Sequence, residues 1–287
     1  MAPVDRGLVS GTLYVVATPL GHLGDVSARA AEVLTSVPIV AAEDTRHSRK
    51  LLTHLGAHPE LLSIHQHTAP ERIDEVVDRL VAGADVAVVT DAGTPVVSDP
   101  GARLVAAARD AGIRVIPIPG PSAVATALSA SGFPADQYLF LGFLERKGSV
   151  RAWQLETVRS SPWTVVLFEA ANRLVATLRD LGGERGGDRS AVVCREMTKV
   201  HEEFRAGTLD TLAAYYDEHP PKGEVTLVVA GATVTEEGSG GQELRAREVA
   251  ARLLRDGLSK RDVVKALQET MQLSRNDAYQ LVNALDA

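Results

Sequence analysis

Residues 85–101 read DVAVVTDAGTPVVSDPG, an apolar run that passes directly into a loop rich in glycine and proline. Four consecutive apolar residues are typical of a strand that is buried on both faces. In open parallel sheets, ligands bind where loops leave the carboxyl ends of the strands. Gly93 permits a positive φ or the close approach of a ligand, and Pro95 fixes the turn that follows. The alternative is a tight structural turn capped by Asp91, and this loop alone does not decide between the two.

Short apolar runs alternate with helical patterns along the first 130 residues. Such alternation predicts parallel strands joined by crossover helices, and therefore a doubly wound α/β domain. The expected strands are residues 12–18, 38–43, 61–66, 85–90 and 113–120, and the expected helices are residues 27–36, 45–55, 70–83, 100–112 and 121–132.

A second α/β set follows a charged, glycine-containing break at residues 143–150. Its expected strands are residues 163–170, 190–197 and 224–231, with helices near 172–181 and 208–217. The Gly/Ser-rich stretch 232–243 predicts a flexible linker, and Ser259 and Ser274 each open a short helix in a helical tail. The expected domains are residues 10–132, 133–231 and 243–287.

The composition, 45% hydrophobic and 23% charged, is that of an ordinary globular protein, with one cysteine and a net charge of −7. Cys194 has no partner for an intrachain disulfide, which favours a reducing, cytoplasmic location. The acidic balance argues against a generally basic nucleic-acid binder, although the last 45 residues are less acidic than the rest. We expect no secretion signal and no membrane span, because no apolar run approaches ~20 residues. The histidines lack zinc spacing, so we expect no metal site.

Two further loops resemble the one after residue 90. ATPLGHLGD (17–25) follows the first expected strand, and PIPGPSA (117–123) follows the fifth. The third loop offers backbone N–H groups at a helix start, where a carboxylate binds well. Neither a dinucleotide-binding glycine fingerprint nor a P-loop is present, which excludes a typical nicotinamide-dependent dehydrogenase. The three loops predict one shared, backbone-walled cleft that suits a cofactor with polar ends and an apolar middle.

The segment AAEDTRHSRK (41–50) ends the second expected strand at the same sheet edge. Glu43 and Asp44 are candidate proton acceptors, and Arg46, Arg49 and Lys50 are candidate phosphate ligands. The alternative is a solvated helix that Asp44 or Thr45 caps. Two weaker candidates are Lys199, in REMTKVHEEF (195–204), and the pair Phe168–Glu169, in LFEAANR (167–173), for which salt bridging and core packing are the competing interpretations.

Taken together, the motifs resemble the ribosomal RNA small subunit methyltransferase I family, within the tetrapyrrole-methylase-like superfamily. The resemblance rests on YVVATPLGHLGD, AAEDTRHSRKLL, VVTDAGTPVVSDPG, IPIPGPSAVATALSASG, FLGFLERK, FEAANRL, CREMTK and KGEVTLVV, which span about residues 10–231. Tetrapyrrole enzymes of the superfamily usually carry Gly-Asp-Pro where this chain has Gly93-Thr94-Pro95. That departure favours the RNA branch.

The resemblance implies a class III S-adenosylmethionine methyltransferase with two α/β domains of the tetrapyrrole methylase type and a small C-terminal helical domain. It also implies a homodimer that 2'-O-methylates a cytidine of 16S ribosomal RNA, in the decoding region of the small ribosomal subunit. By motif match, the cofactor contacts are Pro19, Asp91, Ala92, Gly93, Thr94, Val97, Ser98, Ser122, Ala123, Phe168 and Glu169.

A ribose hydroxyl needs a base to remove its proton during methyl transfer. The candidates are Asp44, then Glu43, then Lys199 if burial lowers its pKa. Arg46 and Lys199 are alternatively phosphate ligands, so we assign Asp44, Glu43, Arg46 and Lys199 to the catalytic set. Two other functions stay open: a cobalamin- or porphyrin-pathway methyltransferase, and a non-catalytic RNA-binding protein of ribosome assembly.

Overall fold

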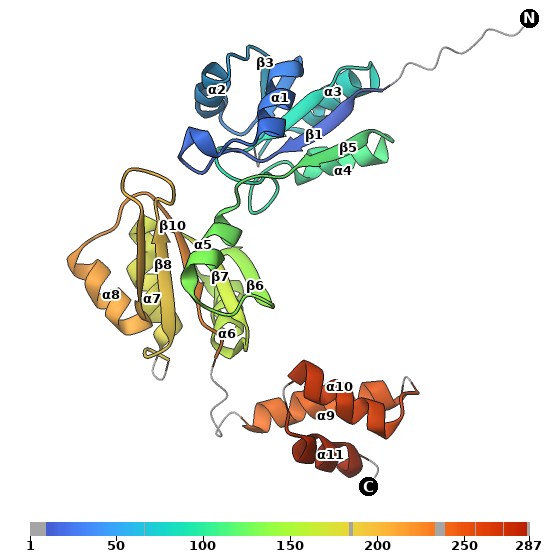
Figure 1. Cartoon of the computed structure of the whole chain (residues 1–287), viewed down its shortest axis with the longest axis vertical. Helices are drawn as coiled ribbons and strands as arrows, with labels where there is room; N and C mark the ends of the chain where they lie inside the picture. The colour runs from blue at the N-terminus through green and yellow to red at the C-terminus, as the bar shows by residue number, and fades with distance from the viewer. Residues whose placement is uncertain are drawn as a thin grey trace, which may run out of the picture. The chain divides into compact units, whose positions relative to one another are not determined.

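The computed structural model describes residues 10–65, 67–183, 186–232, 239–255, 257–271 and 273–285, with the backbone alone for 239–245. Contacts divide the chain into two units, Met1–Gly231 and Ala232–Ala287. The first unit holds two five-stranded sheets, and the second holds three helices among its described residues (Figure 1).

The first sheet is parallel throughout and has the strand order β3-β2-β4-β1-β5. This order confirms the doubly wound arrangement that the alternating sequence predicts. Its strands are β1 (Thr12–Val16), β2 (Ile39–Ala42), β3 (Glu60–Ser63), β4 (Val86–Val89) and β5 (Arg114–Ile118), and the helices of this part are α1 (Ala28–Ser36), α2 (Thr45–His54), α3 (Pro70–Val81), α4 (Ala102–Asp110) and α5 (Ala123–Ser131).

Burial on both faces explains why β4 is apolar throughout. Val86 and Val88 pack into one hydrophobic cluster with α3 and α4, while Ala87 and Val89 pack into another with α1 and α2. Successive side chains of a strand point to opposite faces, so a strand between two helical layers needs apolar residues at every position. The same alternation holds in β2, and all four of its residues are buried.

The second sheet is mixed, with the order β6-β7-β10-β8-β9, in which only the β6–β7 pairing is parallel. Its strands are β6 (Tyr138–Phe143), β7 (Thr164–Ala170), β8 (Ser190–Arg195), β9 (Glu203–Thr208) and β10 (Glu224–Val229), and its helices are α6 (Gly148–Ser160), α7 (Leu174–Gly182) and α8 (Leu209–Glu218).

The sequence analysis misses β6 and β9, which are the two edge strands of this sheet. In β9 the charged residues Glu203 and Arg205 interrupt the apolar pattern from which a strand is predicted. An edge strand tolerates such residues because it needs little apolar surface. In β6 the pairing register shifts between Phe140 and Phe143, and Gly142 has a φ of 62°. This irregularity lies at the start of the break that the sequence predicts over residues 143–150. Helix α6 begins within the same segment.

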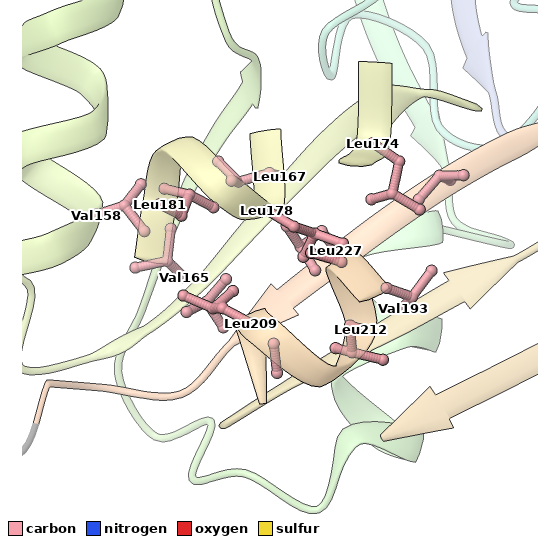
Figure 2. Packing of buried hydrophobic residues seen from close by; sticks show 14 of the residues in the cluster. Val158, Val165, Leu167, Leu174, Leu178, Leu181, Val193, Leu209, Leu212 and Leu227 are labelled. Atoms are coloured by element: carbon pink, nitrogen blue, oxygen red, sulfur yellow. The ribbon is translucent and has the colours of Figure 1, made fainter. Parts of the chain in front are cut away.

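The core of the second sheet lies between its strands and helices α6, α7 and α8 (Figure 2). Leu167 of β7 and Leu227 of β10 contribute from the sheet, while Leu178 of α7 and Leu209 of α8 cover them. All four side chains are almost fully buried. This cluster holds the sheet rigidly enough to present its other face to the first sheet's loops.

That other face packs against α5 and the loops of the first sheet. Leu20, Ala92 and Val124 join a hydrophobic cluster with Val166 of β7 and Cys194 of β8. Helix α5 lies along β10 and β9, although it follows β5 in sequence (Figure 1). Cys194 is buried, and burial raises the pKa of its thiol to about 12.

The second unit contains α9 (Ser239–Arg255), α10 (Lys260–Met271) and α11 (Arg275–Ala284) around a small core. The prediction of a linker over 232–243 is wrong for residues 239–243, which are helical; residues 233–238 lie outside the described part. Tertiary packing overrides the local Gly/Ser composition, because Ala246 and Ala250 of the same helix are fully buried. Ser259 and Ser274 accept hydrogen bonds from Asp262 N and Asp277 N, as expected of helix caps.

Across the part of the chain that the structure describes, no helix has the length and apolar character needed to cross a membrane.

We expect Leu178→Ala to lower the free energy of unfolding by about 2–5 kcal/mol, because it leaves a cavity in the core of the second sheet. Thermal unfolding followed by circular dichroism measures this as a drop in Tm of about 5 °C or more. Val200→Ala is the matched control, since Val200 is 96% exposed. A Tm loss as large in the control, or none in Leu178→Ala, contradicts the assignment of this core.

Candidate active site

The loops that follow β1, β4 and β5 are joined directly by hydrogen bonds. Thr18 N donates to Gly93 O at 2.8 Å, and Gly93 N donates to Thr18 O at 3.0 Å. Thr94 Oγ1 donates to Pro121 O at 3.0 Å. Because β4, β1 and β5 are neighbours in the sheet, their carboxyl ends lie side by side, and these bonds fix the loops to one another.

Gly93 adopts a positive φ, one of the two possibilities that the sequence leaves open for it, with a value of 85°. A Cβ at this position would lie 3.2 Å from Leu20 Cδ2, so both the backbone angle and the space favour glycine. The backbone groups of Gly93 and the hydroxyl of Thr94 are used to hold the loops. These two residues therefore hold the loops in the arrangement that shapes the site.

Strained backbone marks the site on both sides. Val96 and Ser98 of the β4–α4 loop have φ values of 76° and 63°, and Glu196 and Thr198 of the β8–β9 loop have values of 50° and 64°. These are the only non-glycine residues with positive φ in the described chain. Such strain persists where the surrounding structure enforces it, and it concentrates at functional sites.

The β8–β9 loop of the second sheet closes over the β1 loop. His22 N donates to Thr198 Oγ1 at 3.1 Å, and the side chain of Lys199 crosses directly over Gly21. Lys199 Nζ lies 3.0 Å from carboxylate oxygens of Glu196 and of Glu224. The β8–β9 loop and the start of β10 thus place the Lys199 ammonium, paired with two carboxylates, against the β1 loop of the first sheet.

A cavity of about 360 Å³ lies at this meeting point. Four of the predicted site residues line it: Pro19, Asp91, Ala92 and Lys199. The rest of its wall comes from other residues of the β1 loop, from α1, α2, β2 and the end of β4, and from Glu224. The other residues of the predicted catalytic and cofactor sets, those of the third cofactor loop included, do not line the cavity.

Three carboxyls gather behind Thr90 at the cavity wall. Thr90 Oγ1 donates to Glu43 Oε2 at 2.9 Å, and Asp44 N donates to Asp91 Oδ1 at 3.1 Å. Burial is the main cause that raises the pKa of Asp99 to about 6, and the charges of Glu43, Asp91 and Glu224 contribute to this raised value. Thr90 has one hydroxyl hydrogen, which it gives to Glu43.

Asp44 is the N-cap of α2, as one of the two competing interpretations predicts. Its carboxylate accepts from Arg46 N at 2.8 Å and pairs with Arg46 Nη2 at 3.2 Å. The Arg46 side chain, with its backbone N–H, lowers the pKa of Asp44 below its ordinary value. This makes Asp44 a weaker base than expected. Arg46 is 90% exposed, so its guanidinium faces solvent.

Lys199 does not have the lowered pKa that a basic role requires. Burial lowers the pKa of Lys199, but hydrogen bonds and charges from Glu196 and Glu224 outweigh that effect, and the net pKa is raised. The ammonium group therefore stays protonated at neutral pH. Its chemistry is that of a positioned cation.

Phe168 and Glu169 point to opposite faces of β7. The Phe168 ring packs edge-on to Phe140, with ring centroids 4.9 Å apart, on the face turned to the loops. The Glu169 carboxylate is fully buried on the α7 side, where it accepts from Thr177 Oγ1 at 2.6 Å and lies 3.3 Å from Arg173 Nε. Adjacent strand residues cannot both face the loops. Only the backbone of Glu169 is left for a cofactor.

The remaining predicted cofactor residues flank the loops. Ser122 is the N-cap of α5, and Ala123 is the first residue of that helix. The backbone N–H of Ala123 therefore has no acceptor within the helix. Val97 and Ser98 are exposed, and Ser98 Oγ occupies the space that a side chain on Gly142 of β6 would fill. The arrangement offers N–H donors and an apolar wall, which fit a ligand with a carboxylate and an apolar middle.

Sequence reasoning misses Asp99, Thr90 and Ser48, which all belong to this region. Asp99 stands in the quoted loop, but its raised pKa follows from burial and from nearby carboxylates, of which Glu43 and Glu224 are distant in sequence. In the sequence, Thr90 does not differ from an ordinary polar residue that ends a strand. Ser48 resembles a polar position of a solvated helix, yet it is 5% exposed and lines the cavity.

Comparison with known proteins identifies the class. Residues 12–213 match the sequence profile of the Tetrapyrrole (Corrin/Porphyrin) Methylases, and the chain belongs to this family of methyltransferases. The fold agrees. A cobalt precorrin-4 methyltransferase structure matches with a TM-score of 0.60 and 18% identity, covering 80% of this chain and 98% of that one. A uroporphyrin-III C-methyltransferase from Thermus thermophilus, complexed with S-adenosyl homocysteine, matches with a TM-score of 0.57 and 19% identity, covering 77% and 97%.

Sequence relatives place the chain in one branch of that family, the ribosomal RNA small subunit methyltransferase I proteins. The protein of that name from Synechocystis sp. is 45% identical over 96% of this chain and 99% of its own length. Those from Micromonospora olivasterospora and Escherichia coli O157:H7 are 43% and 41% identical, over 95% and 82% of this chain and 87% and 83% of their own.

We expect Asp99→Asn to stabilise the protein more at pH 7.5 than at pH 4.5. A carboxyl whose folded pKa is raised to about 6 binds its proton more tightly in the folded state, so stability falls as pH rises from the ordinary value of 3.8 through about 6. Asparagine does not titrate, so the variant does not lose stability in this way as the pH rises.

The measurement is the Tm of variant and parent between pH 4.5 and 7.5, with Asp110→Asn at the exposed end of α4 as the control. The Tm difference for Asp99→Asn should grow across this range. A difference that stays constant with pH contradicts the raised pKa.

Proposed function

We propose that this chain transfers the methyl group of S-adenosylmethionine to the 2'-oxygen of a cytidine in 16S ribosomal RNA, at position 1402. The observation that carries the proposal is the set of three joined loops beside a cavity that also holds Thr90, Asp91 and Lys199. The names of the sequence relatives support an RNA of the small ribosomal subunit as the substrate. Thr94, in place of the aspartate that tetrapyrrole enzymes usually carry, supports the same branch.

We place the methyl donor along the three loops. Pro19, Asp91, Ala92 and Ser122 would contact it from the first sheet, together with Gly93, Thr94, Val97, Ser98 and Ala123. Phe168 and the backbone of Glu169 would face it from β7. The free N–H groups at the start of α5 suit the donor's carboxylate, and the apolar residues around Leu20 suit its middle. S-adenosylmethionine supplies an activated methyl group, so the orientation of the acceptor oxygen carries much of the rate.

The ribose hydroxyl must lose its proton as its oxygen forms the new bond to the methyl carbon. The carbon–sulfur bond breaks, S-adenosylhomocysteine leaves, and the proton passes to the protein. We assign the proton to the carboxyls behind Thr90, with Asp99 as the acceptor. Its pKa of about 6 leaves it mostly ionised at neutral pH while keeping it more basic than an ordinary carboxylate. Asp44, with its lowered pKa, is a cap and not the base.

Cations near the cavity suit the RNA backbone. Lys50 of α2 lines the cavity, and Arg46 and Arg49 lie exposed on the same helix. Lys199 is held protonated beside the loops, where it can pair with a phosphate or stabilise negative charge. We also propose that the chain forms a homodimer and is located in the cytoplasm, which is the compartment of ribosomal subunits.

A methyl-transfer assay tests the substrate. The full chain is incubated with S-[methyl-³H]adenosylmethionine and either small ribosomal subunits that lack the modification or uroporphyrinogen III. We expect label in 16S RNA, resistant to alkali at the modified nucleotide because the 2'-oxygen is blocked. Label in the tetrapyrrole alone would support the alternative methyltransferase. Label in neither, with no heat on titration of the donor by calorimetry, would favour an RNA-binding assembly factor.

We expect Asp99→Asn to lower kcat for subunit methylation by about 10²–10⁴-fold, because it removes the proton acceptor. The parent's rate should fall below pH 6, where Asp99 is protonated, and the variant should lack this acidic limb. Donor binding measured by calorimetry should be unchanged.

Asp44→Asn and Asp110→Asn serve as comparison variants. We expect a smaller effect from the first, through loss of the α2 cap, and none from the second. A larger loss in Asp44→Asn than in Asp99→Asn would return the basic role to Asp44.

A further inference from the structure

The cavity contains a polar atom that the protein leaves without a partner. Ser48 Oγ is buried and makes no hydrogen bond, and the only other such side-chain atom in the described part is Tyr216 Oη, which does not line the cavity. Buried polar groups in native proteins are nearly always hydrogen-bonded, so each exception needs an explanation. Leaving a buried hydroxyl unpaired destabilises the folded state.

The geometry of α2 does not force this situation on Ser48. Serine and threonine residues elsewhere in helices of this chain donate back to a carbonyl three or four residues earlier. Ser36 Oγ donates to Val33 O at 3.0 Å, and Thr157 Oγ1 donates to Trp153 O at 2.8 Å. Ser48 is 5% exposed and does not make this local bond. Its hydroxyl is left for a group that enters the cavity.

The walls of the cavity have the chemistry of a site for a flat, mostly apolar ring. Leu34, Val40, Leu51 and Val89 line it with aliphatic surface, and all four are buried in the same core cluster. Ser48 adds one hydrogen-bonding group in that surface. Few polar groups in an apolar pocket are typical of a small-molecule site, and about 360 Å³ is at the small end of the usual range.

The rim of the cavity distinguishes between possible occupants. His47 and Lys50 of α2 are exposed side chains that line it, which suits a phosphate outside the pocket. Asp91 also lines it, and so do Glu224 and Lys199, which form an ion pair at 3.0 Å. The α5 N-terminus, which suits the donor's carboxylate, does not line this cavity. The β1 and β4 loops line this cavity, and the β4 loop also bonds to the loop before α5 through Thr94.

We propose that this cavity receives the base of the acceptor nucleotide, turned out from the RNA strand, with Ser48 Oγ as its hydrogen-bonding partner. The inference rests on the proposed function and adds the site that selects the nucleotide. Single-stranded RNA is read in this way, because unstacked bases enter pockets and hydrogen-bond through their edges. Thr90, on the same wall, then lies near the ribose, and its hydroxyl donates to the Glu43 carboxylate.

Two substitutions at Ser48 separate recognition from stability. Ser48→Ala removes the unpaired hydroxyl, and we expect kcat/KM for small subunits to fall about tenfold or more while the Tm stays equal or rises. Ser48→Val also fills part of the cavity, and its loss should be larger. Donor affinity by calorimetry should be unchanged in both. Ser36→Ala, an exposed serine with its local bond, is the matched control.

A binding measurement keeps the inference independent of activity. Methyl NMR of the full chain is recorded during titration with cytidine 5'-monophosphate, with and without saturating S-adenosylhomocysteine. We expect shifts at Val40, Leu51 and Val89, no shift at Leu227, and loss of the shifts in Ser48→Val.

Three outcomes overturn the inference. One is a lowered Tm in Ser48→Ala with unchanged kcat/KM, which makes the residue structural. Another is the absence of cavity shifts with the nucleotide. The third is competition by S-adenosylhomocysteine for the same methyls, which makes the cavity part of the donor site. If the parent methylates a tetrapyrrole but no RNA, the proposed function fails, whereas the nucleotide titration still reports on the cavity.

Discussion

The paired backbone hydrogen bonds between Thr18 and Gly93 are the constraint on which the site depends. They join the loops of two neighbouring strands, and the Thr94–Pro121 bond adds the third. Because Gly93 has a positive φ beside Leu20, the β4 loop reaches this position without a clash. The cavity, the carboxyls behind Thr90 and the crossing Lys199 all depend on this fixed edge. Loops held in this way have little conformational freedom left to lose when a ligand binds.

The second sheet completes a site that the first sheet begins. One of its faces is packed by α6, α7 and α8, and the other meets α5 and the joined loops. Lys199, held between Glu196 and Glu224, and the strained residues Glu196 and Thr198 show that the β8–β9 loop is positioned by contacts on several sides. Positioning of this kind suits methyl transfer, where orientation contributes much of the rate.

The sequence predicts the features that depend on local pattern. The buried strands of the first sheet, the caps at Ser259 and Ser274 and the role of Gly93 in its loop follow from residues within a few positions. Features set by distant neighbours are missed. Strand β9 lacks a clear apolar pattern because it lies at a sheet edge, and the pKa of Asp99 is raised by burial and by the charges of Glu43, Asp91 and Glu224. The Glu169 side chain turns away from the loops because strand alternation separates it from Phe168.

The burial of Cys194 makes the chain convenient for spectroscopy. The thiol has 1% exposure and a pKa of about 12, so almost no thiolate exists at neutral pH to react with maleimides or iodoacetamides. The parent sequence holds no other cysteine. A fluorophore or spin label can therefore be attached at one chosen surface position without first removing a native residue. Position 200, which is 96% exposed next to Lys199, offers a reporter on the movement of the β8–β9 loop.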